Sequence, residues 1–294
     1  QMDLAENQKH NIALVTDSTC DLPQEFIEKH QINVVPLSVH FGDTYYLDRV
    51  TLNPDRFYKM LTKTKDYPSS AQPTFKEFSN KYNYLSTHYD SIIGIHISEA
   101  MSGTCSNSRK AAKTISNFTK KPISVINSKR LSAGLGLITM RAAEAIEAGA
   151  AYDELVKNIE MWSYKTEMFV TTKTMKYLVK SGRVSAVKGF VGKIFGIKPV
   201  ITVTSEGKTQ PIGKPRTEKS SMKLTMKLVE KKIDNRKLWG YAISHADNES
   251  TAKWYAAQMK ELTDGMEPRF INYGSPVLGA NTGPGVVTLS MMFE

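Results

Sequence analysis

The feature that most constrains the fold is a pattern repeated in the first half of the chain, where a short apolar run ends in small polar residues and a helix follows. The runs Ile12–Thr16, Ser91–Ile97 and Ile123–Asn127 are rich in β-branched residues and have the length of buried strands. Such alternation is typical of a mostly parallel sheet with helices on both faces, where ligands bind beyond the carboxyl ends of the strands. We therefore expect an α/β fold with its functional groups in the loops that follow the strands.

The stretch Ile92–Ser106 shows this pattern most clearly. Its strand leads through Ser102-Gly103-Thr104 into a predicted helix that continues to about Asn117. Such a turn offers hydroxyl groups, unpaired backbone N–H groups and the positive end of the helix dipole, which together suit a carboxylate or a phosphate. An ordinary helix N-cap, in which Ser or Thr serves only the local backbone, is the alternative.

Two further hydroxyl-bearing loops, Asp17–Asp21 and Ser69–Thr74, also adjoin strand ends or helix starts. If the three loops converge in space, they form a polar pocket that supplies hydrogen-bond donors. In the first loop, Asp21 is expected to cap the helix Gln24–His30, with Pro23 at its start.

The second half of the chain alternates less regularly, around a predicted hairpin turn at Ser205–Lys208. We expect an α/β domain over residues 1–167 and an α+β domain over residues 168–294. A helix is predicted at Phe190–Gly196. The glycine- and proline-rich stretch Gly274–Gly285 is predicted to be a loop that returns to the domain interface.

Composition narrows the class of protein. A chain of 294 residues is long enough for two domains, and no apolar run is long enough to span a bilayer. The first ten residues contain no signal-peptide segment, and only two cysteines, Cys20 and Cys105, are present, as is common in the reducing cytoplasm. We therefore expect a cytoplasmic protein. No Cys or His spacing matches a metal site, so no metal and no cofactor are predicted.

The positive charge is concentrated in the second half. Residues 1–167 contain 19 Lys or Arg and 19 Asp or Glu, whereas residues 168–294 contain 20 and 10, so the second part carries the whole net charge of +10. An acidic protein partner, a phosphorylated ligand, an anionic membrane surface or nucleic acid would each be attracted to such a surface. A solvated basic face without a binding role is the remaining interpretation.

Several common chemistries have no motif in this sequence. It lacks a P-loop and a G-x-S-x-G elbow, and Gly134-Leu135-Gly136 lacks the third glycine of a dinucleotide-binding turn. Asp17 or Ser18 could be the reactive group of an enzyme acting on a small carboxylated or phosphorylated molecule. No recognisable acidic metal site supports phosphoryl transfer, however, and no histidine is placed by a motif to activate Ser102. Anion binding is the better interpretation of these hydroxyl groups.

Six short motifs occur in order along almost the whole chain, from Ile12 to Phe293. They are Asp17-Ser18-Thr19-Cys20-Asp21-Leu22-Pro23, Ser70-Ala71-Gln72-Pro73, Ile97–Thr104, Ser181-Gly182-Arg183-Val184-Ser185, Lys214-Pro215-Arg216-Thr217 and Gly283-Pro284-Gly285. In this order they resemble the motifs of the DegV family, bacterial fatty-acid-binding proteins that serve as acyl-binding subunits of fatty acid kinase systems. The resemblance implies a two-domain α/β structure, not itself an enzyme, with a fatty acid held between the domains.

The resemblance also implies the ligand and its site. The ligand would be a fatty acid of about 16 to 18 carbons, such as palmitate or stearate, whose tail supplies most of the affinity. The carboxylate would be held by the hydroxyl groups of Ser70 and Ser102 and the N–H of Gly103. The further ligand-binding candidates are Ser18, Thr104 and Asn281. The candidates for an apolar tunnel around the tail are Phe169, Phe190, Ile194, Phe195 and Ile197, and plain core packing is an equal alternative for each.

Two arginines, Arg183 and Arg216, match family arginines that the resemblance implies to engage the kinase partner, which would supply ATP. One motif departs from the family, because His-x-Gly-Pro-Gly is replaced by Asn281-Thr282-Gly283-Pro284-Gly285. Asn can form hydrogen bonds near a carboxylate but can carry neither a proton nor a positive charge. A lipid carrier or sensor without kinase chemistry, in transient contact with a membrane surface, therefore stays open.

Outside the family, the alternative is a nucleic-acid-binding regulator that uses the basic second half. Its lysines are not interleaved with an aromatic platform, and neither a helix-turn-helix nor an RRM motif is present. Nucleic acid is therefore the less favoured partner.

Overall fold

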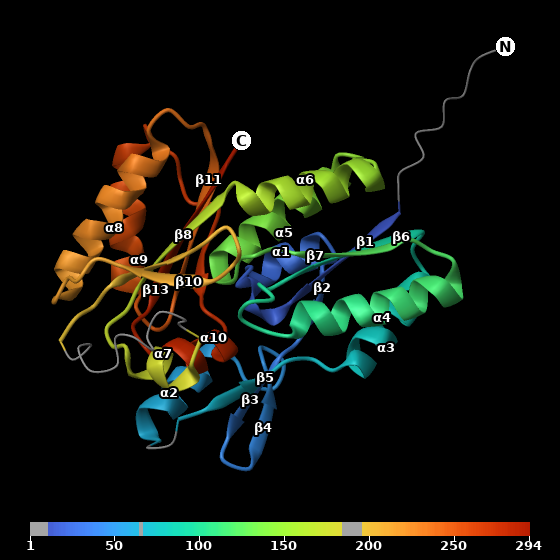
Figure 1. Ribbon diagram of the computed structural model, residues 1–294, viewed down its shortest axis with the longest axis horizontal. Coiled ribbons are helices and arrows are strands. Elements are labelled where there is room, and N and C mark those ends of the chain that lie inside the picture. Colours follow the sequence, from blue (N-terminus) through green and yellow to red (C-terminus); the bar gives the residue numbers. More distant parts are fainter. Residues whose placement is uncertain (1–10, 65–66, 184–195) are drawn as a thin grey trace.

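The computed structural model describes residues 11–64, 67–183 and 196–294, which form a two-domain α/β fold (Figure 1). In the first domain, four strands form a parallel sheet in the order β2-β1-β6-β7. Their bounds are Ile12–Asp17 (β1), Asn33–Val35 (β2), Ser91–His96 (β6) and Ile123–Asn127 (β7). The central strands β1 and β6 are buried along their whole length, as their continuous apolar sequences predict for a sheet covered on both faces.

Helices cover both faces of this sheet. Residues of β1 alternate between them, because Ala13 and Val15 pack with α3 (Phe75–Ser86) and α4 (Thr104–Thr119), whereas Ile12 and Leu14 pack with the helices opposite. The helices on that opposite face are α1 (Gln24–Lys29), α5 (Ser132–Glu147) and α6 (Tyr152–Tyr164).

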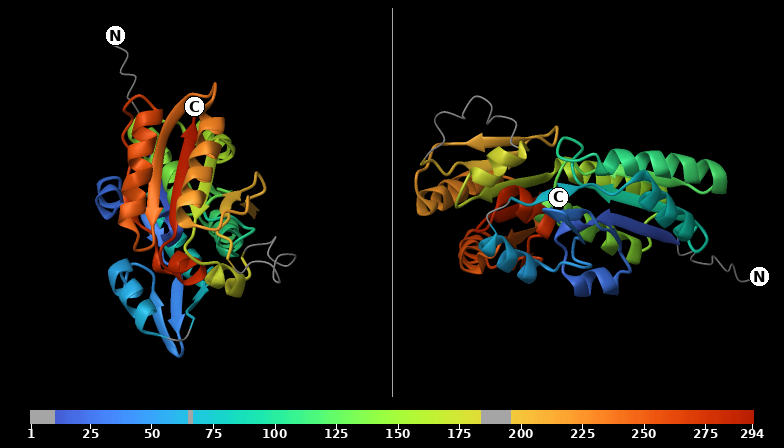
Figure 2. Two further views of the ribbon diagram at one scale, coloured as in Figure 1. Left: turned by 90° about the vertical axis from the view of Figure 1, so that its left-hand side faces the viewer. Right: turned by 90° about the horizontal axis from the view of Figure 1, so that it is seen from below.

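The second domain is built on a six-stranded mixed sheet in the order β10-β9-β8-β13-β11-β12. Its strands are β8 (Thr166–Thr171), β9 (Val200–Val203), β10 (Thr209–Ile212), β11 (Leu238–His245), β12 (Ile271–Tyr273) and β13 (Val287–Phe293), all antiparallel to their neighbours except the parallel pair β11 and β12. Helices α8 (Glu218–Ile233) and α9 (Glu249–Leu262) pack against one face of this sheet (Figure 2).

Helix α5 joins the two domains. It packs against β1 and β6 of the first sheet and against β11 and β13 of the second, and residues 132–140 are all buried. The first half of this helix consists almost entirely of small and apolar residues, which suits a position buried on all sides. Its two glycines allow the close approach, since a Cβ atom would lie 2.6 Å from the sulfur of Met168 at Gly134 and 2.4 Å from the carbonyl oxygen of Cys20 at Gly136.

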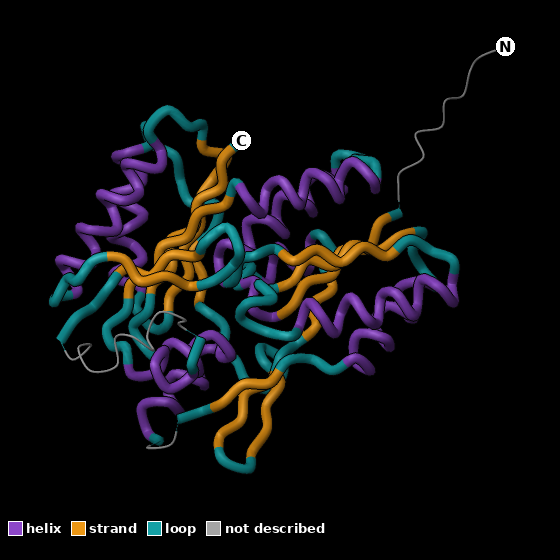
Figure 3. Tube along the Cα trace, in the orientation of Figure 1, coloured by secondary structure: helices purple, strands orange, loops and turns teal. Residues whose placement is uncertain are grey.

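A small antiparallel sheet, in the order β4-β3-β5, forms a third group of strands (Figure 3). It consists of β3 (Ser38–Phe41), β4 (Thr44–Leu47) and β5 (Ser69–Ala71), and it lies near α2 (Pro54–Lys63) and α10 (Pro276–Thr282). Its core contains Phe57 and Leu61 together with Val277 and Ala280 of the second domain. This packing brings β5 close to α10.

Two local predictions are wrong. Asp21 does not cap α1, whose N-cap residue is Pro23; Asp21 ends the short 3-10 helix η1 (Ser18–Cys20) with a φ of 53°, and its side chain turns inward. The stretch Gly274–Gly285 is not a continuous loop, because Ser275 caps α10 and Pro276 begins it. The division of the chain at residue 167 stays a prediction, and most of the helix expected at Phe190–Gly196 lies outside the described residues.

Candidate functional site

A cavity of about 600 Å³ lies between the domains. From the first domain it is lined by β5 and by the loops that follow β6 and β7. From the second it is lined by β8, β9, α10 and α7 (Lys176–Ser181). The carboxyl ends of parallel strands are the position expected for a ligand site in an α/β protein.

Most of the cavity wall is apolar. The first domain contributes Ile97 and Leu131, and the second contributes Val170, Ile201 and Val203. Sequence reasoning did not single out these side chains. A signal existed for Ile201 and Val203, because residues two apart on a strand share one face. Val170 and Leu131 are brought to the cavity only by the packing of the two domains.

At the start of α4 the cavity wall becomes polar. Gly103 is the N-cap residue of this helix, and no acceptor for its N–H lies among the described residues. The Ser102 hydroxyl lies 2.8 Å from that of Thr104 and accepts a hydrogen bond from the Thr104 N–H at 3.3 Å. A helix N-terminus with a free N–H and a neighbouring hydroxyl group can bind one end of an anion.

The side chain of Gln72 lies beside Gly103 at the start of α4. A Cβ atom on Gly103 would lie 2.5 Å from the amide group of Gln72, so the glycine leaves room for the Gln72 side chain in its present position. Gln72, Ser102 and Gly103 all line the cavity.

A second polar group joins the domains across the cavity. Asn281 of α10 donates one amide hydrogen to the Ser70 hydroxyl oxygen at 2.9 Å and another to the carbonyl oxygen of Val277 at 2.8 Å. Because the Ser70 oxygen already accepts a hydrogen bond, its own hydrogen is available for an acceptor in the cavity. Ser70 and Asn281 both line the cavity, so this pair supplies an oriented donor.

Two charged side chains also reach the wall. Arg183 lines the cavity and donates to the carbonyl oxygen of Ser181 at 2.9 Å. Glu99 lines it too, but its carboxylate is paired with Arg109 at 2.5 Å, which offsets its charge. Among the described residues, the cavity therefore combines an apolar wall, neutral donors, Arg183 and the paired Glu99.

The other predicted site residues lie elsewhere. Thr104 is buried behind Ser102, and Ser18 is buried and donates to Asp48 at 2.7 Å while accepting from the Leu37 N–H at 3.1 Å. Phe169 packs in the core of the second domain, on the face that α8 and α9 cover, and does not line the cavity. The predicted tunnel residues Phe190, Ile194 and Phe195 lie outside the described residues.

Ile197 and Arg216 line a different hollow, of about 570 Å³, on the other side of α7. In the part of the chain that the structure describes, Lys173, Lys176, Lys180 and Lys198 also line it. Arg183 and Arg216 are thus not brought to one site, although both belong to the basic part of the chain.

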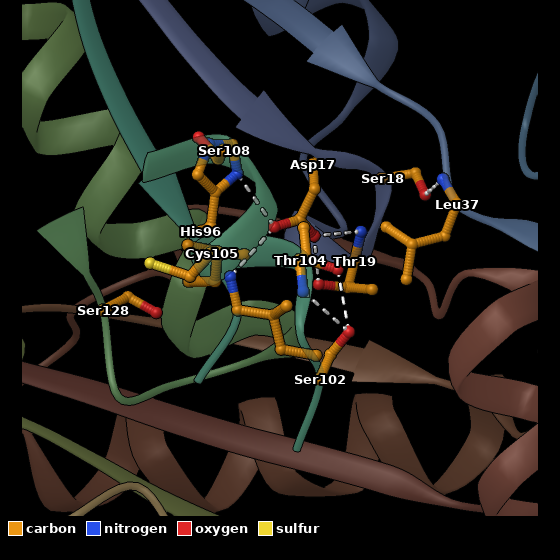
Figure 4. A network of polar contacts seen from close by, with 12 residues as sticks. Asp17, Ser18, Thr19, Leu37, His96, Ser102, Thr104, Cys105, Ser108 and Ser128 are labelled. Atoms are coloured by element: carbon orange, nitrogen blue, oxygen red, sulfur yellow. Dashed lines mark hydrogen bonds and ion pairs between the residues drawn. The ribbon is translucent and has the colours of Figure 1, made fainter. Parts of the chain in front are cut away.

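The carboxylate of Asp17 lies between Thr19 and His96, at the ends of β1 and β6 (Figure 4). It is fully buried and accepts hydrogen bonds from the N–H and hydroxyl of Thr19, from the Ile97 N–H and from the His96 ring. Asp17 and Ser18 both form hydrogen bonds within the protein, and neither lines the cavity. The geometry therefore does not favour them as reactive groups.

The thiol groups offer no reactive centre. Burial raises the pKa of Cys20 to about 12 and also raises the pKa of Cys105, so both stay protonated at neutral pH. Within the described ranges, no three His, Cys, Asp or Glu side chains are grouped so as to hold a metal ion, and no helix is long and apolar enough to cross a membrane.

Fold and cavity together define a two-domain α/β protein that encloses an apolar cavity with hydrogen-bond donors on part of its wall. The chain belongs to the DegV family, since the model for this family, described as "Uncharacterised protein, DegV family", matches residues 11–294. A DegV domain-containing protein of Clostridium acetobutylicum is 30% identical over 284 residues, which cover 96% of this chain and 99% of the relative.

Solved structures show the same fold. The crystal structure of DegV, a fatty acid binding protein from Bacillus subtilis, is 26% identical with a TM-score of 0.87 and covers 97% of this chain and 100% of that one. A DegV family protein from Thermus thermophilus, whose structure describes its fatty acid binding, has the same TM-score of 0.87 at 25% identity, with coverage of 97% and 100%.

Proposed function

We propose that this protein binds a long-chain fatty acid of about 16 to 18 carbons in the cavity between its domains. One observation carries the proposal: an apolar wall and hydrogen-bond donors suited to a carboxylate line the same interdomain cavity. The solved DegV structures of Bacillus subtilis and Thermus thermophilus, both described as binding fatty acids, support the same ligand class.

Tail and head group would contribute differently. A tail of about 15 methylenes gains about 0.8 kcal/mol for each one buried, or about 12 kcal/mol in total. Association and ordering of the tail remove several kcal/mol of this. The apolar wall would therefore supply the affinity, and the head-group contacts would fix the position of the carboxylate.

The carboxylate would lie between α4 and β5. In this position it accepts hydrogen bonds from the Gly103 N–H, the Ser102 hydroxyl and the Ser70 hydroxyl, which Asn281 orients. Thr104 supports Ser102 from behind, and Ser18 supports the loop before β3 without contacting the ligand. All the proposed head-group contacts in this arrangement are neutral.

Presentation of the acyl carboxylate to a separate kinase, or to a membrane surface, is the second part of the proposal. Arg183 at the cavity and Arg216 at the neighbouring lysine-lined hollow would attract an acidic partner. Asn281 cannot transfer a proton, so any acid–base step would need a group supplied by the partner. The protein alone would act as a carrier rather than as an enzyme.

Extraction of lipid from the purified protein, followed by mass spectrometry, tests the ligand directly. A fatty acid in stoichiometric amount, or uptake of added palmitate by delipidated protein, is expected. Ser70→Ala combined with Ser102→Ala should lower palmitate affinity at least tenfold, because hydrogen bonds to a charged group contribute about 1.5 to 3 kcal/mol each. The matched control replaces two exposed serines, Ser205→Ala and Ser250→Ala, and should bind normally. Protein that neither contains nor takes up a fatty acid would refute the proposal.

A further inference from the structure

Four buried polar side chains, Asp17, His96, Tyr82 and Ser108, form a continuous series of contacts near the start of α4, and Figure 4 labels Asp17, His96 and Ser108. The Asp17 carboxylate lies 3.2 Å from Nδ1 of His96, whose Nε2 lies 3.4 Å from the hydroxyl of Tyr82. That hydroxyl lies 2.5 Å from the hydroxyl of Ser108. All four side chains are fully buried, and none of them lines the cavity.

The hydrogen bonds in this chain have one consistent direction. With Asp17 ionised and His96 neutral, His96 carries its hydrogen on Nδ1 and donates it to Asp17, and its Nε2 accepts from Tyr82. Tyr82 in turn accepts from Ser108. With the histidine neutral, each of the four side chains has a partner.

A glycine in strand β6 makes room for the hydrogen-bonded side chains. Gly94 lies in the middle of the buried strand β6, where a glycine normally weakens packing. A Cβ atom there would lie 2.6 Å from the Tyr82 hydroxyl and 3.0 Å from Nε2 of His96. The glycine therefore leaves the space that the Tyr82–His96 contact occupies.

Asp17 and Ser108, the two ends of this hydrogen-bonded series, lie on either side of the turn that contains the proposed carboxylate donors. Asp17 accepts from the N–H of Ile97, the first residue after β6 and a residue of the cavity wall. At the other end, Ser108 lies one turn along α4 from Thr104, so it fixes the first turns of the helix that Gly103 caps. Between these two anchors lies the turn with Ser102 and Gly103.

We propose that Asp17, His96, Tyr82 and Ser108 are positioning residues, which set the place of the Gly103 N–H and the Ser102 hydroxyl and so determine that the cavity prefers a free carboxylate to a neutral head group. This inference rests on the proposed binding of a fatty acid. Since the four residues touch the site only through the turn, they act on recognition of the head group and not on burial of the tail.

The test compares palmitate with methyl palmitate, which share a tail and differ in charge at the head. Tyr82→Phe removes one hydroxyl group and keeps the ring beside Phe78. We expect this variant to lower palmitate affinity about fivefold, the loss of about one buried hydrogen bond, with less than about a twofold change for methyl palmitate. The amide resonance of Gly103 should also shift in the ligand-free variant.

The matched control is Tyr255→Phe, which removes a buried hydroxyl group that contacts Thr171 in the second domain. It should leave the ratio of the two affinities unchanged. If Tyr82→Phe fails to fold, Ser108→Ala breaks the same chain at its other end and should change the ratio in the same direction.

The outcomes separate the two proposals. A wild-type protein that binds no palmitate overturns both the proposed function and this inference. Wild-type binding with an unchanged affinity ratio in Tyr82→Phe and Ser108→Ala, or an equal loss for acid and ester, overturns the positioning role alone.

Discussion

Two carboxylates near the end of β1, Asp17 as its last residue and Asp21 four residues later, are both fully buried and have different surroundings. Asp17 accepts hydrogen bonds from Thr19, His96 and Ile97, all between residues 17 and 97. Asp21 is paired with Arg49 at 3.3 Å and accepts hydrogen bonds from the Ser132 hydroxyl at 2.6 Å and from the Ser275 N–H at 2.8 Å. The first set of partners lies within one sheet and its loops, whereas the second set extends to the segment before α10.

This difference assigns separate roles to neighbouring residues. The contacts of Asp17 converge on the turn at the head-group site, while those of Asp21 connect segments that are distant in sequence. Arg49 strengthens that connection, because it also donates to the carbonyl oxygen of Tyr273 at 2.5 Å. Replacement of Asp21 should therefore affect stability first, and replacement of Asp17 should affect recognition of the carboxylate as well.

The largest effect is expected for Asp21→Ala. The variant leaves the half-buried Arg49 without the carboxylate that lies 3.3 Å away and should lower the free energy of unfolding by about 3 kcal/mol, the lower end of the range for a broken buried ion pair. Urea denaturation measures this loss. Asp55→Ala, which breaks the exposed Asp55–Lys59 pair, is the control and should cost less than about 0.5 kcal/mol. Equal costs for the two variants would contradict the structural role of Asp21.

Asp17→Asn should have a smaller effect on stability and a distinct effect on binding. The new NH₂ group must face donors that Asp17 now accepts from, at Thr19, His96 or Ile97, so at least one hydrogen bond is lost. We expect a loss of about 2 kcal/mol in unfolding free energy. Palmitate affinity should fall more than methyl palmitate affinity, as calorimetric titration of both ligands would show. A stability loss without any change in the affinity ratio would remove the distinction between the two carboxylates.

A third buried carboxylate, Asp48, lies near Arg49, the partner of Asp21, and it makes the stability of the protein depend on pH. Burial raises the pKa of Asp48 to about 7 from an ordinary value of 3.8, although Arg49 and Ser18 oppose the shift. Between these two values the folded chain binds more protons than the unfolded chain, so stability contributed by this group is present at low pH and is lost as the pH rises toward 7.

Asp48→Asn removes this titration. Between pH 5 and pH 8 the wild type should lose about 2 to 3 kcal/mol relative to the variant, with most of the change complete by about pH 7. Chemical denaturation at a series of pH values checks this. A difference between the two proteins that is constant with pH would show that Asp48 is already ionised at pH 5 in the folded chain.

Much of the first domain follows from local sequence patterns. The apolar runs around Ile93 and Leu14 predict its parallel sheet, and small polar residues predict the turn at Gly103. The family resemblance places Ser70, Ser102 and Asn281 together, and all three line the cavity of the structure. These features depend on strand period, turn chemistry and motif order, which a single sequence contains.

The remaining features depend on contacts between distant segments. Asp21 precedes Pro23 as a helix cap would, but Arg49, Ser132 and Ser275 draw its carboxylate inward. In the sequence, the glycines of α5 resemble part of a dinucleotide-binding turn. In the structure, Gly134 instead allows the helix to pack closely against Met168. Local propensity cannot reveal such partners, because they are more than 25 residues away in the chain.

The smallest effect is expected where the domains meet through a neutral contact, at Asn281 and Ser70. Asn281→Leu keeps a similar volume but removes the donor to the Ser70 oxygen, so the Ser70 hydroxyl is no longer oriented toward the ligand. We expect about a fivefold loss of palmitate affinity, corresponding to about 1 kcal/mol. The matched control is Asn272→Leu, which removes a donor to the carbonyl oxygen of Asp21 at a distance from the cavity. Palmitate binding should be unchanged in this control; an equal loss in both variants would mean that contact between the domains, and not the orientation of Ser70, governs the affinity.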